Sequence, residues 1–164
     1  MTPQQPVHTA RVVVGVDRTG SHNHQILAAA FEQARSSHAD LCIVHALTPD
    51  PPSTRPLDAV GRRRQYATRH DHMHSTTADL RRQIAHLGEH GTVHYDIRYG
   101  DPATLILAAA QHADLIVVGT RDPGHGSAFL LGPVSQDIAV HSTCPVLLIP
   151  TTSTTDDTAE AVHG

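Results

Sequence analysis

Short aliphatic runs alternate along the chain with longer stretches in which apolar residues recur every three or four positions. An aliphatic run bounded by turn residues is typical of a buried strand, and the longer spacing is typical of an amphipathic helix. The alternation therefore predicts a β-α-β-α-β-α-β-α-β order, with parallel strands joined by right-handed helical crossovers. The predicted strands are 11–16, 40–46, 93–98, 114–119 and 145–149.

The stretches between these strands carry signals for helix ends. Ser21 or Asn23 is a suitable N-cap for the first helix, and Asp101 followed by Pro102 is suitable for the third, as N-cap and first helical residue. The second stretch is long, polar and rich in Arg and His, and it predicts one helix, continuous or broken, whose second half is the firmer and which ends near Gly88. The predicted helices span about 21–35, 57–90, 103–112 and 134–141.

These elements predict a single α/β domain over residues 10–150. Its architecture is an open five-stranded parallel sheet with helices on both faces, a Rossmann-like arrangement. Residues 1–9 and 151–164 are polar, lack an apolar pattern and are expected to form disordered tails. The length of 164 residues is that of one domain.

Composition narrows the classes of function. Aromatic residues make up only 3% of the chain, so its core must consist of Val, Ile, Leu and Ala, which suits a buried parallel sheet. A net charge of −4 argues against a broad basic face for nucleic acid. The chain shows no signal-peptide pattern and no apolar run long enough to cross a membrane, so a cytoplasmic location is expected. There, Cys42 and Cys144 are expected to be small buried hydrophobic residues without a disulfide.

Two segments are placed where a ligand would bind an open parallel sheet, outside the carboxyl ends of strands at which the strand order reverses. Asp17 follows the first strand, and the Gly-rich segment 119–126 follows the fourth. Glycine backbones and the N-terminus of the helix after Gly132 suit a phosphate group, and the hydroxyl of Ser135 lies nearby in sequence. From these residues alone, a phosphate site and ordinary turn chemistry both remain open.

Three segments give a more specific indication. They are VGVD at 14–17, GDP at 100–102 followed by HADLIVVGTR at 112–121, and FLLGPVSQDIAVHSTCPVLLIP at 129–150. Together they closely resemble the universal stress protein family, as a UspA-like single domain, over about residues 10–150. The resemblance implies an adenine nucleotide alpha hydrolase-like fold, a homodimer formed through the last strand, a stress-response role and, as in many members, bound ATP.

The same resemblance implies a set of nucleotide contacts. Asp17 is expected beside the ribose and the backbone of Ala46 beside the adenine. The glycines and polar residues of the loop after the fourth strand are expected around the phosphates. These are Gly119, Arg121, Gly124, Gly132, Val134 and Ser135.

Two residues depart from the family pattern. Asp122 stands where the second loop glycine belongs, and its charge repels a triphosphate unless it ligates a bridging Mg²⁺. Pro133 stands where Ser or Thr belongs, and it lacks both the hydroxyl and the backbone N–H. The sequence thus predicts ATP binding, with or without magnesium and with slow hydrolysis at most, since no catalytic base is identifiable. The alternative is a nucleotide-free dimeric interaction protein whose ATP loop has degenerated.

Histidine and arginine runs mark the second helical stretch. In the segment from His70 to His74 only these two histidines share a helix face, so a solvated polar face is expected rather than a metal site. Adventitious nickel or zinc binding there remains open. The basic cluster is interpreted as a solvated helix face or a surface for an acidic protein partner, because no aromatic residues interleave it for stacking on nucleic-acid bases. It comprises Arg55, Arg62, Arg63, Arg64 and Arg69.

Overall fold

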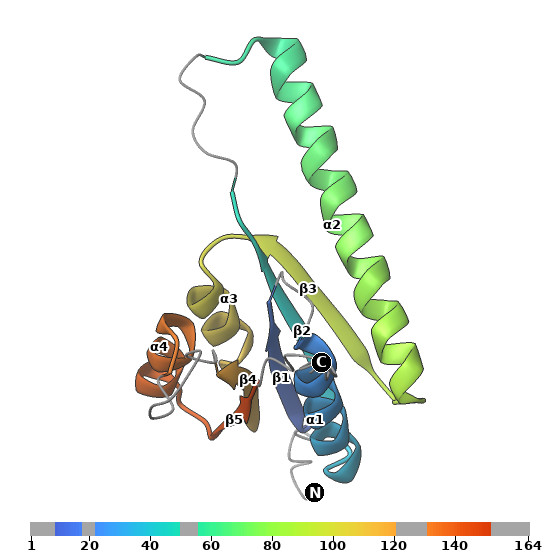
Figure 1. The fold of residues 1–164 in the computed structure, drawn as a ribbon, viewed down its shortest axis with the longest axis vertical. Helices are drawn as coiled ribbons and strands as arrows, with labels where there is room; N and C mark the ends of the chain where they lie inside the picture. Colours follow the sequence, from blue (N-terminus) through green and yellow to red (C-terminus); the bar gives the residue numbers. More distant parts are fainter. Residues whose placement is uncertain (1–8, 18–21, 50–55, 121–130, 152–164) are drawn as a thin grey trace, which may run out of the picture.

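The computed structural model describes residues 9–17, 22–49, 56–120 and 131–151. Its strands are β1 (Arg11–Val16), β2 (Asp40–Leu47), β3 (Val93–Tyr99), β4 (Leu115–Thr120) and β5 (Val146–Pro150). Its helices are α1 (Asn23–Ser36), α2 (Ala59–Leu87), α3 (Pro102–Ala109) and α4 (Pro133–His141). All the strand pairings are parallel, in the order β3-β2-β1-β4-β5, which confirms the predicted α/β fold (Figure 1).

The strand order contains one reversal. From the central strand β1 the chain adds β2 and then β3 on one side, and it returns to the other side for β4 and β5. Adjacent strands β1 and β4 therefore leave the sheet toward helices on opposite faces. Their carboxyl ends form the topological switch point, where ligands of open α/β sheets bind.

Strand β1 is buried on both faces, which explains its continuous run of valines. Val12 and Val14 pack into a core with residues of α1 and α2, including the fully buried Leu27. Val13 points to the other face and packs with Ile106 of α3 and Ile138 of α4. The two helical layers thus hold β1 from both sides and fix the position of its end.

Helix α2 is a single continuous helix of 29 residues, which answers the question that the sequence left open. It begins after Asp58, whose side chain accepts a hydrogen bond from the Gly61 N–H at 2.7 Å, and it ends at Gly88, which has a φ of 124°. Leu80 and Ile84 are buried against the sheet, whereas the N-terminal half extends past the sheet into solvent (Figure 1). The second half, which the sequence predicts to be the firmer, is thus the half that is buried against the sheet.

The starts of the other helices show one error of the sequence prediction. Asp101 caps α3 as predicted, accepting a hydrogen bond from the Thr104 N–H at 2.9 Å. In α1, however, the N-cap is His22 and no side chain caps the helix, so the prediction of an Asn23 cap is wrong. Asn23 is the first helical residue, and its side chain is used elsewhere. Ser21, the other predicted cap, lies outside the described residues.

Both cysteines are free thiols, Cys42 buried and Cys144 half-buried. Burial, followed by the charge of nearby Asp96, raises the pKa of the Cys42 thiol, so Cys42 is protonated near neutral pH. No helix in the described segments is long and apolar enough to cross a membrane. Of the two predicted tails, only residues 9 and 151 are described; the rest of 1–9 and 151–164 lies outside the described residues.

Candidate functional site

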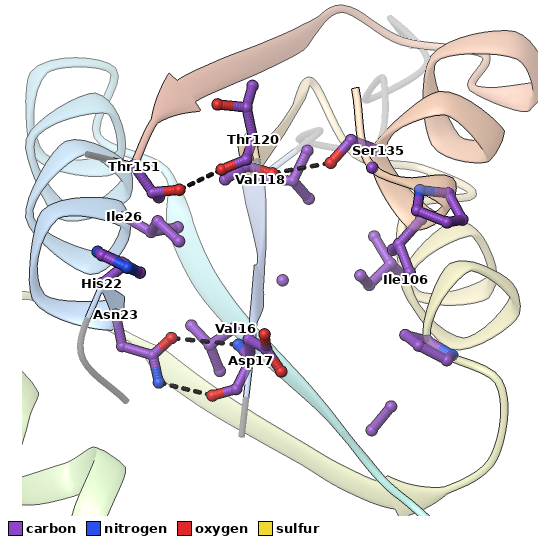
Figure 2. A pocket seen from close by; sticks show the side chains of 17 residues that line it. Val16, Asp17, His22, Asn23, Ile26, Ile106, Val118, Thr120, Ser135 and Thr151 are labelled. Carbon is purple, nitrogen blue, oxygen red and sulfur yellow. Dashed lines mark hydrogen bonds between the residues drawn. The ribbon is translucent and has the colours of Figure 1, made fainter. Parts of the chain in front are cut away.

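A pocket of about 590 Å³ opens at the carboxyl ends of β1 and β4, at the switch point of the sheet (Figure 2). Its lining comes from these two strand ends, the end of β2, the first turns of α1 and α4, one side of α3, and Thr151 after β5. A cavity of this size holds a small organic ligand or a cofactor. The position and volume make this pocket the candidate binding site.

Six of the eight residues predicted from the sequence line this pocket. Asp17 and Ala46 lie at the ends of β1 and β2, and the other four come from β4 and the start of α4. Arg121 and Gly124 lie outside the described residues, as does Asp122. The six residues that the topology brings together are Asp17, Ala46, Gly119, Gly132, Val134 and Ser135.

The end of β1 is held by a buried amide. The Asp17 N–H donates to Asn23 Oδ1 at 3.1 Å, and Asn23 Nδ2 donates to the Asp17 carbonyl at 2.8 Å (Figure 2). Asn23 is only 5% exposed, and both ends of its amide are satisfied by this pair of bonds. The backbone of Asp17 is thereby fixed, while its side chain stays exposed at the pocket.

Two glycines form the floor of the pocket, and a side chain at either position would displace an isoleucine of the walls. A Cβ on Gly15 would lie 2.4 Å from Ile106 Cδ1, and a Cβ on Gly119 would lie 2.6 Å from Ile26 Cδ1. Ile26 and Ile106 stand on opposite sides of the pocket (Figure 2). The strand backbones thus line the floor directly, between two apolar walls.

Helix α4 points its N-terminus into the pocket. Gly132 is the N-cap and Pro133 the first helical residue, so the first N–H groups of the helix are those of Val134 and Ser135, which have no intrahelical partner. Amides at this end, together with the helix dipole, favour an anionic group. Pro133 occupies the first helical position without strain, since its missing N–H would have no helical partner there.

The hydroxyl of Ser135 is directed toward the sheet. It donates a hydrogen bond to the Gly119 carbonyl at 2.7 Å, joining α4 to the end of β4 (Figure 2). Phosphate oxygens accept hydrogen bonds, so in this arrangement Ser135 offers an anion its backbone N–H. The Ser135 hydroxyl therefore fixes the position of the helix N-terminus relative to the strand.

Several residues of the site carry no sequence signal for it. The local pattern at Asn23 indicates a helix cap, and Ile26 and Ile106 belong to ordinary apolar helix faces. Thr151 falls in a predicted tail, yet it is buried and its hydroxyl donates to the Thr120 carbonyl (Figure 2). No local pattern marks Thr151, because the residues after it are polar and the threonine is buried only through contacts with distant strands.

The lining suits binding of a polar ligand. The start of α4 and Asp17 both line the pocket, together with the apolar side chains of Ile26 and Ile106. The hydroxyls of Ser135 and Thr151 both donate to backbone carbonyls. A ligand with an anionic group, an apolar ring and hydroxyls that donate to a carboxylate matches this arrangement.

Comparison with known proteins identifies a family of similar sequences and structures. The model of the universal stress protein family matches residues 8–150. A universal stress protein of Thermus aquaticus, described as lying in the QAH/OAS sulfhydrylase 3′ region, is 33% identical over 133 residues, which cover 78% of this chain and 90% of that protein.

Solved structures of similar fold include UspA from Lactobacillus plantarum, with a TM-score of 0.64, 22% identity, and coverage of 87% of this chain and 98% of that one. A universal stress protein in complex with cAMP has a TM-score of 0.62 at 22% identity and covers the same shares of the two chains. The universal stress protein from Archaeoglobus fulgidus in complex with dAMP has a TM-score of 0.55 at 24% identity, again over 87% and 98%.

Proposed function

The chain belongs to the universal stress protein family, and on this premise we propose that it binds an adenine nucleotide, ATP, in the pocket at the carboxyl ends of β1 and β4. It acts as a cytoplasmic stress-response module through binding, with little or no turnover of the nucleotide. The observation that carries the proposal is the meeting of six predicted nucleotide contacts in one pocket of about 590 Å³.

Each part of the pocket matches one part of the nucleotide. The N–H groups of Val134 and Ser135 at the start of α4 take the phosphates, where the helix dipole favours negative charge. The carboxylate of Asp17 accepts hydrogen bonds from the ribose hydroxyls, and the backbone of Ala46 meets the adenine. The cAMP and dAMP complexes of structural relatives support an adenine nucleotide as the ligand. Asp122, which lies outside the described residues, would hold a Mg²⁺ ion, and the ion would offset the negative charge of the phosphates.

Gly132 offers the most direct test of this assignment. Its φ of −64° and ψ of 164° are accessible to any residue, so Gly132→Glu places a carboxylate at the start of α4 without backbone strain. A like charge next to phosphate costs about 1–4 kcal/mol, which corresponds to a loss of ATP affinity of about fivefold to several hundredfold. Isothermal titration calorimetry of both proteins measures this loss.

Gly91→Glu is the matched control. Gly91 is exposed, and a Cβ added there would have no heavy atom within 4 Å, so this variant adds the same charge away from the pocket. It should bind ATP as the unsubstituted protein does. If both variants keep full affinity, the nucleotide does not lie against α4.

The second candidate is a nucleotide-free homodimer that binds a protein partner. Strand β5 favours it, because β5 is a sheet edge and its residues Val146 to Ile149 are only partly buried. An unpaired strand edge pairs readily with another chain. This candidate predicts no ATP affinity in the native chain and a gain of affinity when Asp122→Gly and Pro133→Ser restore the family loop.

A further inference from the structure

Two histidines of α2 point their ring nitrogens at one another. The Nε2 atoms of His70 and His74 are 3.2 Å apart, and the ring centroids are 4.3 Å apart. Both side chains are exposed, so the pair is accessible from solvent. Residues four apart lie on the same helix face, and the helix backbone therefore holds the two imidazoles together.

The distance between the two nitrogens matches a metal chelate. A Zn²⁺ ion bound at about 2.0–2.1 Å separates two imidazole nitrogens by about 2.9 Å at a right angle and by about 3.3 Å at the tetrahedral angle. The observed 3.2 Å lies between these values. In the tautomer in which Nδ1 carries the proton on both rings, the lone pairs of both Nε2 atoms are available to a metal ion.

We propose that His70 and His74 chelate one divalent transition-metal ion, with water in the remaining coordination positions. Imidazole is a ligand for Zn²⁺, Ni²⁺ and Cu²⁺, and hard ions such as Mg²⁺ and Ca²⁺ are excluded because they require oxygen ligands. Within residues 9–17, 22–49, 56–120 and 131–151 no group of three or more His, Cys, Asp or Glu side chains is placed to hold a metal. The site is therefore a two-ligand chelate, distinct from the pocket at the strand ends.

The pair lies where α2 leaves the support of the sheet. On the sheet side, the Arg69 guanidinium lies 4.9 Å from the centroid of the Tyr99 ring, at the end of β3, and His72 Nδ1 is 3.5 Å from the Tyr99 hydroxyl. Toward the helix N-terminus, Tyr66 stacks on His70 with a centroid distance of 6.3 Å and is itself 74% exposed. A metal ion that ties positions 70 and 74 together stabilises the helix at two exposed positions.

Titration calorimetry with Zn²⁺, repeated with Ni²⁺, tests the proposal on the full chain. His70→Ala and His74→Ala each remove one ligand and should weaken binding by more than about tenfold, because the loss of even a hydrogen-bond partner of a metal ligand costs about 10- to 100-fold. His72→Ala is the matched control, because residue 72 points away from the other two on the helix. It should leave the affinity of this site within about twofold.

Thermal unfolding followed by circular dichroism gives a second readout. Zn²⁺ should raise the melting temperature of the unsubstituted protein and of His72→Ala, and should leave that of His70→Ala and His74→Ala unchanged. Unchanged zinc affinity in both single variants overturns the proposal, since the ion would then bind at other histidines. An equal loss in His72→Ala also overturns it, because the ligand set would be different.

Discussion

Asp101 couples the stability of the domain to pH at a single residue. Its carboxylate accepts hydrogen bonds from the Thr104 N–H at 2.9 Å and from the Thr104 hydroxyl at 2.7 Å. These bonds, the backbone one first, hold the pKa of Asp101 below its ordinary value of 3.8 in the folded state. A lowered folded pKa stabilises the fold above pH 3.8, and this contribution is lost as the pH falls through the folded pKa.

Asp101→Asn removes the titratable carboxyl group and keeps a side chain that can cap α3. Asparagine caps a helix about as well as aspartate, so the variant should stay folded at pH 7 while losing the acid-dependent part of the stability. Urea unfolding at pH 7 and pH 3 should show a smaller difference between the two pH values in the variant than in the unsubstituted protein. An identical difference would mean that the carboxylate of Asp101 does not contribute to acid sensitivity.

Helix α2 has two halves with different energetics. Leu80 is 3% exposed and packs in the core beneath the sheet, whereas Val60 is 65% exposed in the half that extends past the sheet. Leu80→Ala should therefore destabilise the protein by about 2–5 kcal/mol, the usual cost of a large-to-small change in a core. Val60→Ala should change stability by about 0.5 kcal/mol or less.

Urea denaturation at neutral pH compares the two variants directly. Both substitutions introduce the same residue in the same helix, so the difference between them reports packing against the sheet. Similar losses of stability in both variants would show that α2 is held along its whole length, in conflict with the extended N-terminal half seen in Figure 1.

The elements themselves were largely predictable because burial leaves a periodic pattern. The aliphatic runs marked every strand to within one residue at each end, and Asp101 with Pro102 marked the start of α3. Asn23 was not predictable in the same way. An asparagine near a helix start has the same local signal whether it caps the helix or bonds a strand end, and only the position of the Asp17 backbone beside Asn23 decides between them.

At the scale of the whole molecule, the strand order is what assembles the candidate site. The sequence supplied the residues at the ends of β1, β2 and β4. Parallel pairing brings these strand ends to one edge of the sheet, and the reversal of strand order between β1 and β4 opens the pocket there. The walls were not predictable, because Ile26 and Ile106 resemble any other apolar helix residue until the sheet places them opposite each other. The direction of the Ser135 hydroxyl was likewise beyond local pattern, since its partner is the distant carbonyl of Gly119.

ATP binding in this pocket is tested by isothermal titration calorimetry of the purified chain with ATP, with and without Mg²⁺. Any co-purified nucleotide is identified first. We expect ATP to bind saturably in the micromolar range, and more tightly with Mg²⁺ if Asp122 ligates the ion. If millimolar ATP gives no heat and no nucleotide co-purifies, the proposal that the chain binds ATP is wrong. The pocket at the ends of β1 and β4 would then be a remnant of a nucleotide site in a protein that acts through its partners.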